Sequence, residues 1–268
     1  MHTILAIDPA WTVRESSGVA LVREVGEGWA CVGLTPSYSQ FVALADGTPV
    51  DWSTTPSSGE PPVSELLDSA QRLLEGAPVD LVTIDMPVAT IPISGRRAPD
   101  AAISQAFGGR GCSTHSPSVE RPGLISDRLR ASFTDCGYPL ATSVTPPGTT
   151  PALMEVYPHP ALLVLLGADY RVPYKLSRAR RYWPELSPSE RRRATAETWR
   201  AIYEALSVKI SGDALPLPPS DAIDGIGNTR LKRYEDALDA LICAWIGIQY
   251  LQGNCSPYGD EFAAIWTP

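Results

Sequence analysis

The sequence predicts an α/β fold: a mixed β-sheet, made of a three-stranded antiparallel meander followed by parallel strands, with helices on its faces. Two observations predict it. Three apolar segments near the N-terminus, at 3–8, 17–24 and 28–36, follow one another closely, which is typical of an antiparallel meander. An amphipathic helix at 64–76 then leads to another apolar strand at 79–87, as in a crossover to a parallel strand.

The N-terminal elements each have a local signal. The turn "VGEG" at 25–28 joins the second and third strands. Residues 46–62 are rich in proline, glycine and serine, and we predict a loop there. In the helix that follows, apolar residues recur at helical spacing, Ser64 is a candidate N-cap, and Gly76 is a candidate stop.

The second half alternates between loop-like and regular segments. A stretch rich in proline, glycine and serine covers 87–151, a strand is predicted at 152–160, and a helix follows at 160–166. The helix at 187–206 opens with a capping box of Ser and Glu and has proline at its first position. The residues at 212–222 are loop by composition, and the last clear element is a helix at 233–253.

Composition limits the class of protein. The 268 residues are 44% hydrophobic and 19% charged, as in globular proteins. No apolar run is long enough to cross a membrane, and the first twelve residues lack the features of a signal peptide, so we expect a cytoplasmic protein without membrane contact. The five cysteines form no CxxC pair, and we predict free thiols.

The net charge of −8 gives no general attraction to nucleic acid, so such binding would need a local basic patch. One candidate lies between Lys175 and Arg193, where seven basic residues stand against two acidic ones. A solvated helix face explains this run of charge equally well.

Three carboxylates interrupt strands that are otherwise apolar: Asp8, Asp85 and Glu155. A lone carboxylate in such a place loses hydration without compensation, or takes up a proton. Three of them on separate strands suggest a common purpose, because ligands bind at strand ends in open α/β sheets.

The predicted C-terminal helix adds Asp236 and Asp239, which lie on one helix face because they are three residues apart. Asp236 also suits a first-turn position, where a negative charge interacts favourably with the helix dipole, whereas Asp239 lies between apolar residues in the second turn.

Clustered carboxylates repel one another unless a cation lies between them. Mg²⁺, with Mn²⁺ as a possible substitute, prefers such oxygen ligands. Two such ions about 4 Å apart can activate a water molecule and stabilise the leaving oxygen in phosphodiester cleavage, without a Ser or Cys nucleophile.

Several segments together resemble the DUF429 family: "AIDPAWT…SGVALV", "TIDMP", "GRRAPD", "FGGRGCSTHSP", "MEVYPHPALLVLLG", "RVPYK" and "YEDALDALICAW". That family is regarded as predicted nucleases of the RNase H-like fold. The resemblance implies a single RNase H-like domain over residues 1–268, with insertions at about 88–150 and about 176–230.

The layout also resembles the Holliday-junction resolvase branch of that superfamily, in which strand acids and a "DxxD" pair on a late helix hold Mg²⁺. By position this resemblance implies a metal site at Asp8, Asp85, Asp236 and Asp239. Asp85 stands where the resolvases usually have Glu. Glu155 belongs to the DUF429 pattern, and we count it as a fifth catalytic residue; for the metal ligands we select Asp8, Asp85, Glu155 and Asp239.

Five further residues are candidates for substrate binding: Arg96, Arg97, Arg110, His159 and Lys175. The arginines lie in a glycine-rich segment that could reach phosphates, although a surface loop ordered by salt bridges with Asp100 is an equal alternative. His159 could act as an acid or position water, or simply cap the helix that follows.

The sequence therefore predicts a metal-dependent phosphodiester hydrolase, a nuclease acting on DNA or RNA. Two alternatives remain open. One is a nucleotide-binding phosphotransferase of the actin-like superfamily, against which the lack of glycine at Ala10 counts. The other is a non-catalytic module that binds nucleic acid or protein through the basic segment.

Overall fold

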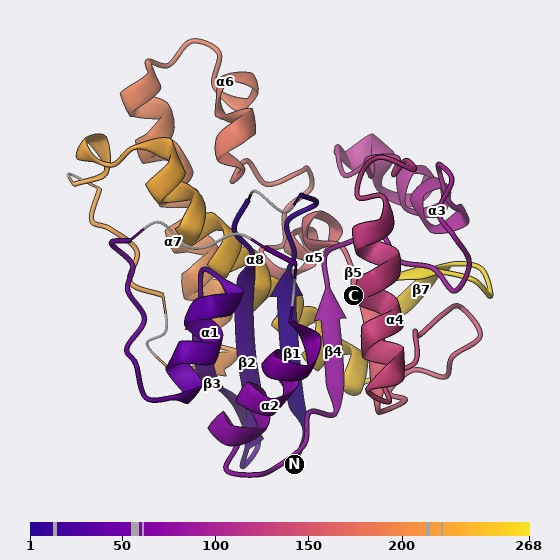
Figure 1. The fold of residues 1–268 in the computed structure, drawn as a ribbon. Helices are drawn as coiled ribbons and strands as arrows, with labels where there is room; N and C mark the ends of the chain where they lie inside the picture. Colours follow the sequence, from indigo (N-terminus) through magenta and orange to yellow (C-terminus); the bar gives the residue numbers. More distant parts are fainter. Residues whose placement is uncertain (13–14, 55–58, 61, 213–214, 221) are drawn as a thin grey trace.

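A computed structural model describes residues 1–12, 15–54, 59–60, 62–212, 215–220 and 222–268. Its centre is an eight-stranded mixed sheet with the strand order β6-β3-β2-β1-β4-β5-β8-β7 (Figure 1). Helices flank this sheet, which confirms the predicted class of an RNase H-like α/β fold. Parts of the predicted loops 46–62 and 212–222 lie outside the described residues.

The predicted order of strands is also confirmed. The antiparallel meander consists of β1, β2 and β3, and β4 and β5 then add to β1 in parallel. Their bounds are β1 Thr3–Asp8, β2 Gly18–Val25, β3 Gly28–Thr35, β4 Leu81–Ile84 and β5 Ala152–Val156.

The prediction that the last clear element is a helix is wrong. Two strands follow it, β7 (Ser256–Gly259) and β8 (Ala264–Thr267), and β8 pairs in parallel with β5. A two-residue strand, β6 (Ile210–Ser211), pairs with β3 at the other edge. These strands are short, and β7 contains proline and glycine, so the sequence gives no apolar run for it.

Helices cover both faces of the sheet (Figure 1). The residues of β1 alternate between two apolar clusters: Ile4 and Ala6 pack on the side of α5, α7 and α8, whereas Leu5 and Ile7 pack on the side of α1, α2 and α4. The bounds are α1 Tyr38–Ala45, α2 Val63–Leu73, α4 Leu124–Asp135, α5 Pro158–Leu165, α7 Pro188–Ser207 and α8 Asn228–Leu251. The helix α3 (Ala98–Phe107) lies against β7 and β8, and the remaining helices are α6 Ala179–Tyr182, η1 Gly108–Arg110, η2 Leu176–Arg178 and η3 Ile223–Gly225.

Several helix predictions need correction. The helix α2 has Pro62 rather than Ser64 at its N-cap, and it ends at Leu73 because Glu75 and Gly76 adopt left-handed backbone angles, with φ of 58° and 97°. The helices α3 and α4 lie within the stretch 87–151, whose average composition hides them, and α1 lies between the predicted strand and loop, where no element is predicted from the sequence. The capping box of α7 is confirmed, with Glu190 N donating to the Ser187 hydroxyl.

The helix α8 starts at Asn228, five residues before the predicted start at 233. Asp236 therefore lies inside the helix rather than in its first turn, and the dipole explanation for this residue is wrong. Its carboxylate must be stabilised by partners other than the helix N-terminus.

Two glycines let α8 lie close to the sheet. A Cβ atom on Gly18 of β2 would lie 1.9 Å from the carbonyl oxygen of Asp236, so the helix backbone occupies the space of a side chain. Further along, a Cβ on Gly247 of α8 would lie 3.0 Å from Thr83 Cγ2 and 3.1 Å from Ile4 Cγ2. The hydroxyl of Thr83 also donates to the carbonyl of Cys243 at 3.1 Å, which ties β4 to the helix.

None of the helices in the described ranges combines the length and the apolar character needed to cross a membrane. All five cysteines are free, as predicted.

The variant Gly18→Ala should destabilise the fold by about 1–3 kcal/mol or more, because the added Cβ forces α8 away from the sheet. The measurement is the free energy of unfolding in urea. Gly28→Ala is the matched control, since its Cβ would meet nothing nearer than 3.9 Å. Equal stability of the two variants would show that the close approach is dispensable.

Candidate functional site

Two aspartates leave the same edge of the sheet. Asp8 ends β1 and Asp85 follows β4, and these strands pair with Ile7 opposite Ile84. The amide of Asp85 donates to the carbonyl of Ile7 at 3.1 Å. Strand alternation puts Asp8 on the side of Ile4 and Ala6, which faces α8. The carboxylates of neighbouring strands therefore gather beneath this helix.

The helix α8 brings two more aspartates to this edge. Asp236 lies against Gly18, whose register partner in β1 is Asp8. Its carboxylate accepts a hydrogen bond from the Ser16 hydroxyl at 2.9 Å. Asp239, one turn further, is completely buried and accepts from the Tyr174 hydroxyl at 2.7 Å. The charges of Asp239, Asp236 and Asp85 all act on Asp8, so the four aspartates lie in one cluster, and their role as a metal site stays a prediction.

Two lysines lie among these carboxylates. Lys175 forms an ion pair with Asp239 and lies 3.9 Å from Glu235, and Lys232 forms ion pairs with Asp236 and, at 3.1 Å, with Glu235. Sequence reasoning missed Lys232 and Glu235. Their spacing was the available signal, because each lies four residues before an aspartate already identified and hence on the same helix face.

Side chains of α7 and α8 hold the loop that carries Lys175. Glu235 Oε2 accepts from the backbone amide of Leu176 at 2.7 Å. The indole of Trp199, on α7, donates to the carbonyl of Tyr174 at 2.7 Å. Lys175 is therefore positioned by bonds to both flanking residues, from α8 on one side and α7 on the other.

Mutual repulsion shows in the pKa values of the carboxyl groups. Desolvation by the surrounding protein, and then the charge of Asp239, hold the pKa of Asp8 well above its ordinary value. Desolvation also raises the pKa of Asp85 to about 7, despite attraction by Lys175, and that of Asp236 to about 6, despite attraction by Lys232. Burial would lower the pKa of Lys175, but Asp239 and Glu235 raise it, so this ammonium stays charged. The site holds more negative charge than its lysines neutralise.

The donor chemistry fits a hard divalent cation, because the excess charge is carried by carboxylate oxygens. Within the described residues, however, no three Asp, Glu, His or Cys side chains are placed to coordinate one ion. Asp8 and Asp85 line the open pocket, whereas Asp239 lies behind Lys175. In this arrangement the ammonium of Lys175 takes the place of a cation beside Asp239.

Glu155 lines the same pocket as Asp8 and Asp85, and after desolvation its charge contributes to the raised pKa of Asp85, but its carboxylate is bound by other partners. Met154 and Val156 pack on the α8 side, and alternation turns Glu155 away from it. Both guanidinium nitrogens of Arg97 donate to Glu155 at 2.6 Å, and the amide of Val88 donates at 3.0 Å. This ion pair is buried, and it leaves Glu155 engaged rather than free for a metal.

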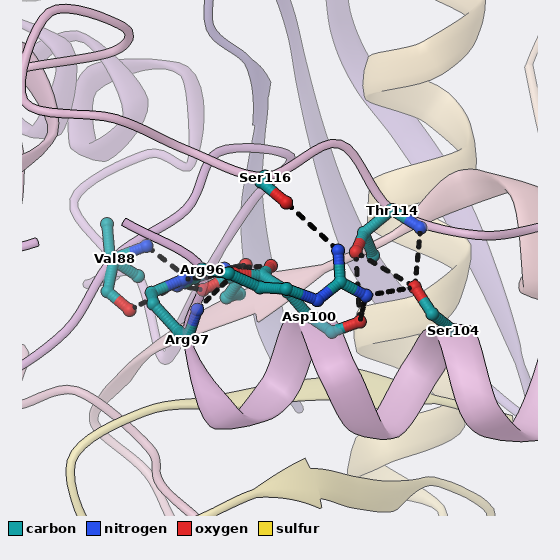
Figure 2. A network of polar contacts seen from close by, with 8 residues as sticks. Val88, Arg96, Arg97, Asp100, Ser104, Thr114 and Ser116 are labelled. Carbon is teal, nitrogen blue, oxygen red and sulfur yellow. Dashed lines mark hydrogen bonds and ion pairs between the residues drawn. The ribbon is translucent and has the colours of Figure 1, made fainter. Parts of the chain in front are cut away.

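The predicted substrate-binding arginines are used inside the protein. Arg97 also pairs with the buried Asp100 at 2.9 Å, so the alternative of a loop ordered by Asp100 is what the structure shows for it (Figure 2). Arg96 donates to Ser104, Ser116 and the Asp100 carbonyl, as Figure 2 also shows. Arg110 donates to the carbonyls of Ala168 and Asp169. None of the three arginines is among the described residues that line the pocket.

The carboxylates form one wall of a pocket of about 880 Å³. Lys175 and His159, two of the predicted residues, line it together with three arginines, Arg121, Arg171 and Arg178, which we call its basic wall. The ring of His159 is buried and contacts Arg171, and burial followed by the charge of Arg171 holds the pKa of His159 well below its ordinary value. His159 is therefore neutral near pH 7, where it can accept a hydrogen bond but has no proton to give as an imidazolium.

A family model described as a protein of unknown function, DUF429, matches residues 18–263. The chain belongs to the DUF429 family. The resemblance inferred from sequence motifs is thereby confirmed, although the match begins after Asp8. No curated protein and no solved structure matches the chain significantly.

The stability of this DUF429 protein without metal should fall as pH rises from 5 to 8. Asp85 keeps its proton up to about pH 7 when folded but loses it near its ordinary value of 3.8 when unfolded. The folded state thus binds more protons in this window, and the free energy of unfolding decreases with pH. For each extra proton that the folded state binds, the free energy of unfolding changes by about 1.4 kcal/mol per pH unit.

Urea unfolding in EDTA at pH 5, 6, 7 and 8 measures this slope. Asp85→Asn should make the slope shallower and the protein more stable than the wild type at pH 8. The exposed Asp68→Asn on α2 is the control. A wild-type stability that rises toward pH 8 would contradict the expectation.

Breaking the buried pair should be costly. Arg97→Leu leaves Glu155 and Asp100 as buried carboxyls without a counter-charge, and we expect a loss of about 3–5 kcal/mol in unfolding free energy. Arg96→Leu, at an exposed neighbour with neutral partners, should cost much less. Similar losses of unfolding free energy in both variants would show that the buried pair of Arg97 and Glu155 stabilises the fold no more than the contacts of Arg96 do.

Proposed function

We propose that this DUF429 protein is a divalent-metal-dependent phosphodiester hydrolase that acts on nucleic acid. The observation that carries the proposal is the convergence of Asp8, Asp85 and Asp239, from three elements far apart in sequence, at one edge of the sheet. Their mutual repulsion favours capture of a cation, and the pocket they border has a basic wall suited to phosphate.

Asp8 and Asp85, which line the pocket, are the residues that would hold Mg²⁺, or Mn²⁺ in its place, and Asp239 would join them where Lys175 releases its carboxylate. When bound, such an ion lowers the pKa of a coordinated water molecule and offsets the charge that develops on the phosphate. The guanidinium groups of the basic wall cannot coordinate a water molecule, so by themselves they would not lower its pKa.

The other residues position this set. Ser16 and Lys232 hold the carboxylate of Asp236, which makes it a support for the site. Lys175 holds Asp239, and its ammonium, a compact point charge, can contact a phosphate oxygen of the substrate. His159, whose Nε2 contacts Arg171, supports that arginine at the pocket wall.

The two alternatives receive less support. The amide of Ala10 donates to the Ser17 hydroxyl at 2.9 Å, so it is not free to cradle a phosphate as in an actin-like hairpin. In the basic segment, Arg191 donates to the carbonyls of Trp183 and Pro184, and Arg193 pairs with Asp224. These internal contacts reduce the charge that the segment offers to a partner.

Asp8→Asn should abolish cleavage of labelled DNA and RNA oligonucleotides in Mg²⁺ or Mn²⁺, with the fold intact by circular dichroism, because it removes a carboxylate from the strand edge. The same variant should lose the rise in melting temperature that Mn²⁺ produces in the wild type. Asp68→Asn should keep both. If the wild type degrades no single-stranded or structured DNA or RNA in either metal, the proposed activity is wrong.

A further inference from the structure

We propose that the basic wall of the pocket selects single-stranded nucleic acid, with Arg178 at a phosphate and the Arg121–Trp11 pair against a base. The inference deepens the proposed function by naming its substrate class. Binding by this wall is nevertheless separable from cleavage, because none of these residues belongs to the carboxylate set.

The wall lacks the counter-charges that other arginines of the chain have. Arg97 pairs with Glu155 and Arg193 with Asp224, but for Arg121, Arg171 and Arg178 no ion pair is found among the described residues. Uncompensated guanidinium groups that face a pocket are typical of phosphate recognition.

The three arginines surround His115. Burial, and then the charges of Arg178, Arg171 and Arg121, lower the pKa of His115. Arg178 Nη2 donates a hydrogen bond to Nε2 of the neutral ring at 2.8 Å. His115 therefore orients one guanidinium without adding charge, and it leaves the remaining nitrogens of Arg178 for a ligand.

Arg171 has a different role. Its nitrogens contact the Gly111 carbonyl at 3.2 Å, the Tyr182 hydroxyl at 3.4 Å and the ring of His159. These contacts engage each of its three nitrogens, so we assign it a contribution of positive potential rather than a direct contact. Arg178 and Arg121 are left as the groups that can touch the substrate.

Trp11 supplies an aromatic surface at the same pocket. The guanidinium of Arg121 lies 5.8 Å from the centre of the Trp11 ring, and Arg121 is exposed. Aromatic rings and guanidinium planes are the surfaces on which unpaired bases stack in single-strand complexes. In a duplex the base faces are covered by their neighbours and cannot use such a surface.

Size and charge favour a single strand as well. A pocket of about 880 Å³ encloses a ligand of small-molecule size, which suits one or two nucleotides. With a net charge of −8, the chain offers little attraction to the two phosphate backbones of a duplex. A local basic wall inside a pocket can attract one strand without a wide basic surface.

The test is fluorescence anisotropy with labelled octamers of single-stranded DNA and RNA and with the matching duplex, in EDTA and in Ca²⁺, at 50 to 200 mM salt. We expect single strands to bind at least tenfold more tightly than the duplex. Arg178→Gln and Arg121→Gln should each weaken binding about five- to twentyfold, and Arg178→Gln should reduce the slope against log salt by about one. Arg180→Gln, exposed and outside the pocket lining, should change binding less than twofold.

Duplex binding equal to or tighter than single-strand binding, no binding of either, or equal losses in Arg180→Gln would overturn the inference. The proposed activity fails separately. A protein that binds single strands through Arg178 and Arg121 but cleaves nothing in Mg²⁺ or Mn²⁺ keeps this inference and loses the activity. A protein that cleaves, with the KM unchanged in both arginine variants, keeps the activity and loses this inference.

Discussion

The site depends on how closely α8 lies on the sheet. Gly18 has no side chain, and the backbone of Asp236 fills that space beside the register partner of Gly18, Asp8. Helix–sheet packing with ordinary side chains between the layers would move the helical carboxylates outward. Because this contact is between two backbones, it sets the distance of α8 from the sheet. The carboxylates of α8 therefore lie close to those at the ends of the strands.

That arrangement concentrates charge where water is scarce. Desolvation, and then the charges of neighbouring carboxylates, raise the pKa values of Asp8, Asp85 and Asp236, and Lys175 and Lys232 offset only part of this effect. Such a site contributes little to the stability of the fold, because ion pairing seldom offsets the full free-energy cost of desolvating buried charges. Its retention in a compact core makes sense if the charge serves a ligand, and the arginines that line the pocket supply the complementary sign.

The sequence predicts the fold where a segment shows a clear apolar pattern or a capping motif. The strands β1 to β5 and the cap of α7 fall in this group, and the four residues of β4 lie within the longer apolar segment 79–87. The strand β7, by contrast, contains proline and glycine and has no apolar run, and β8 follows it closely. The convergence of Asp8 and Asp85 followed from parallel strand ends. The engagement of Glu155 did not, because β5 is apolar on both faces, and the sequence of such a strand does not say which face meets α8. Only the partner, Arg97, reveals it.

The bond from the Trp199 indole to the Tyr174 carbonyl gives α7 a part in the chemistry of a pocket that it does not border. The helix α7 therefore helps to position Lys175, although none of its described residues lines the pocket. A substitution that moves Trp199 would shift the loop at Tyr174, and with it the ammonium of Lys175 that pairs with Asp239, while every acidic side chain stayed the same.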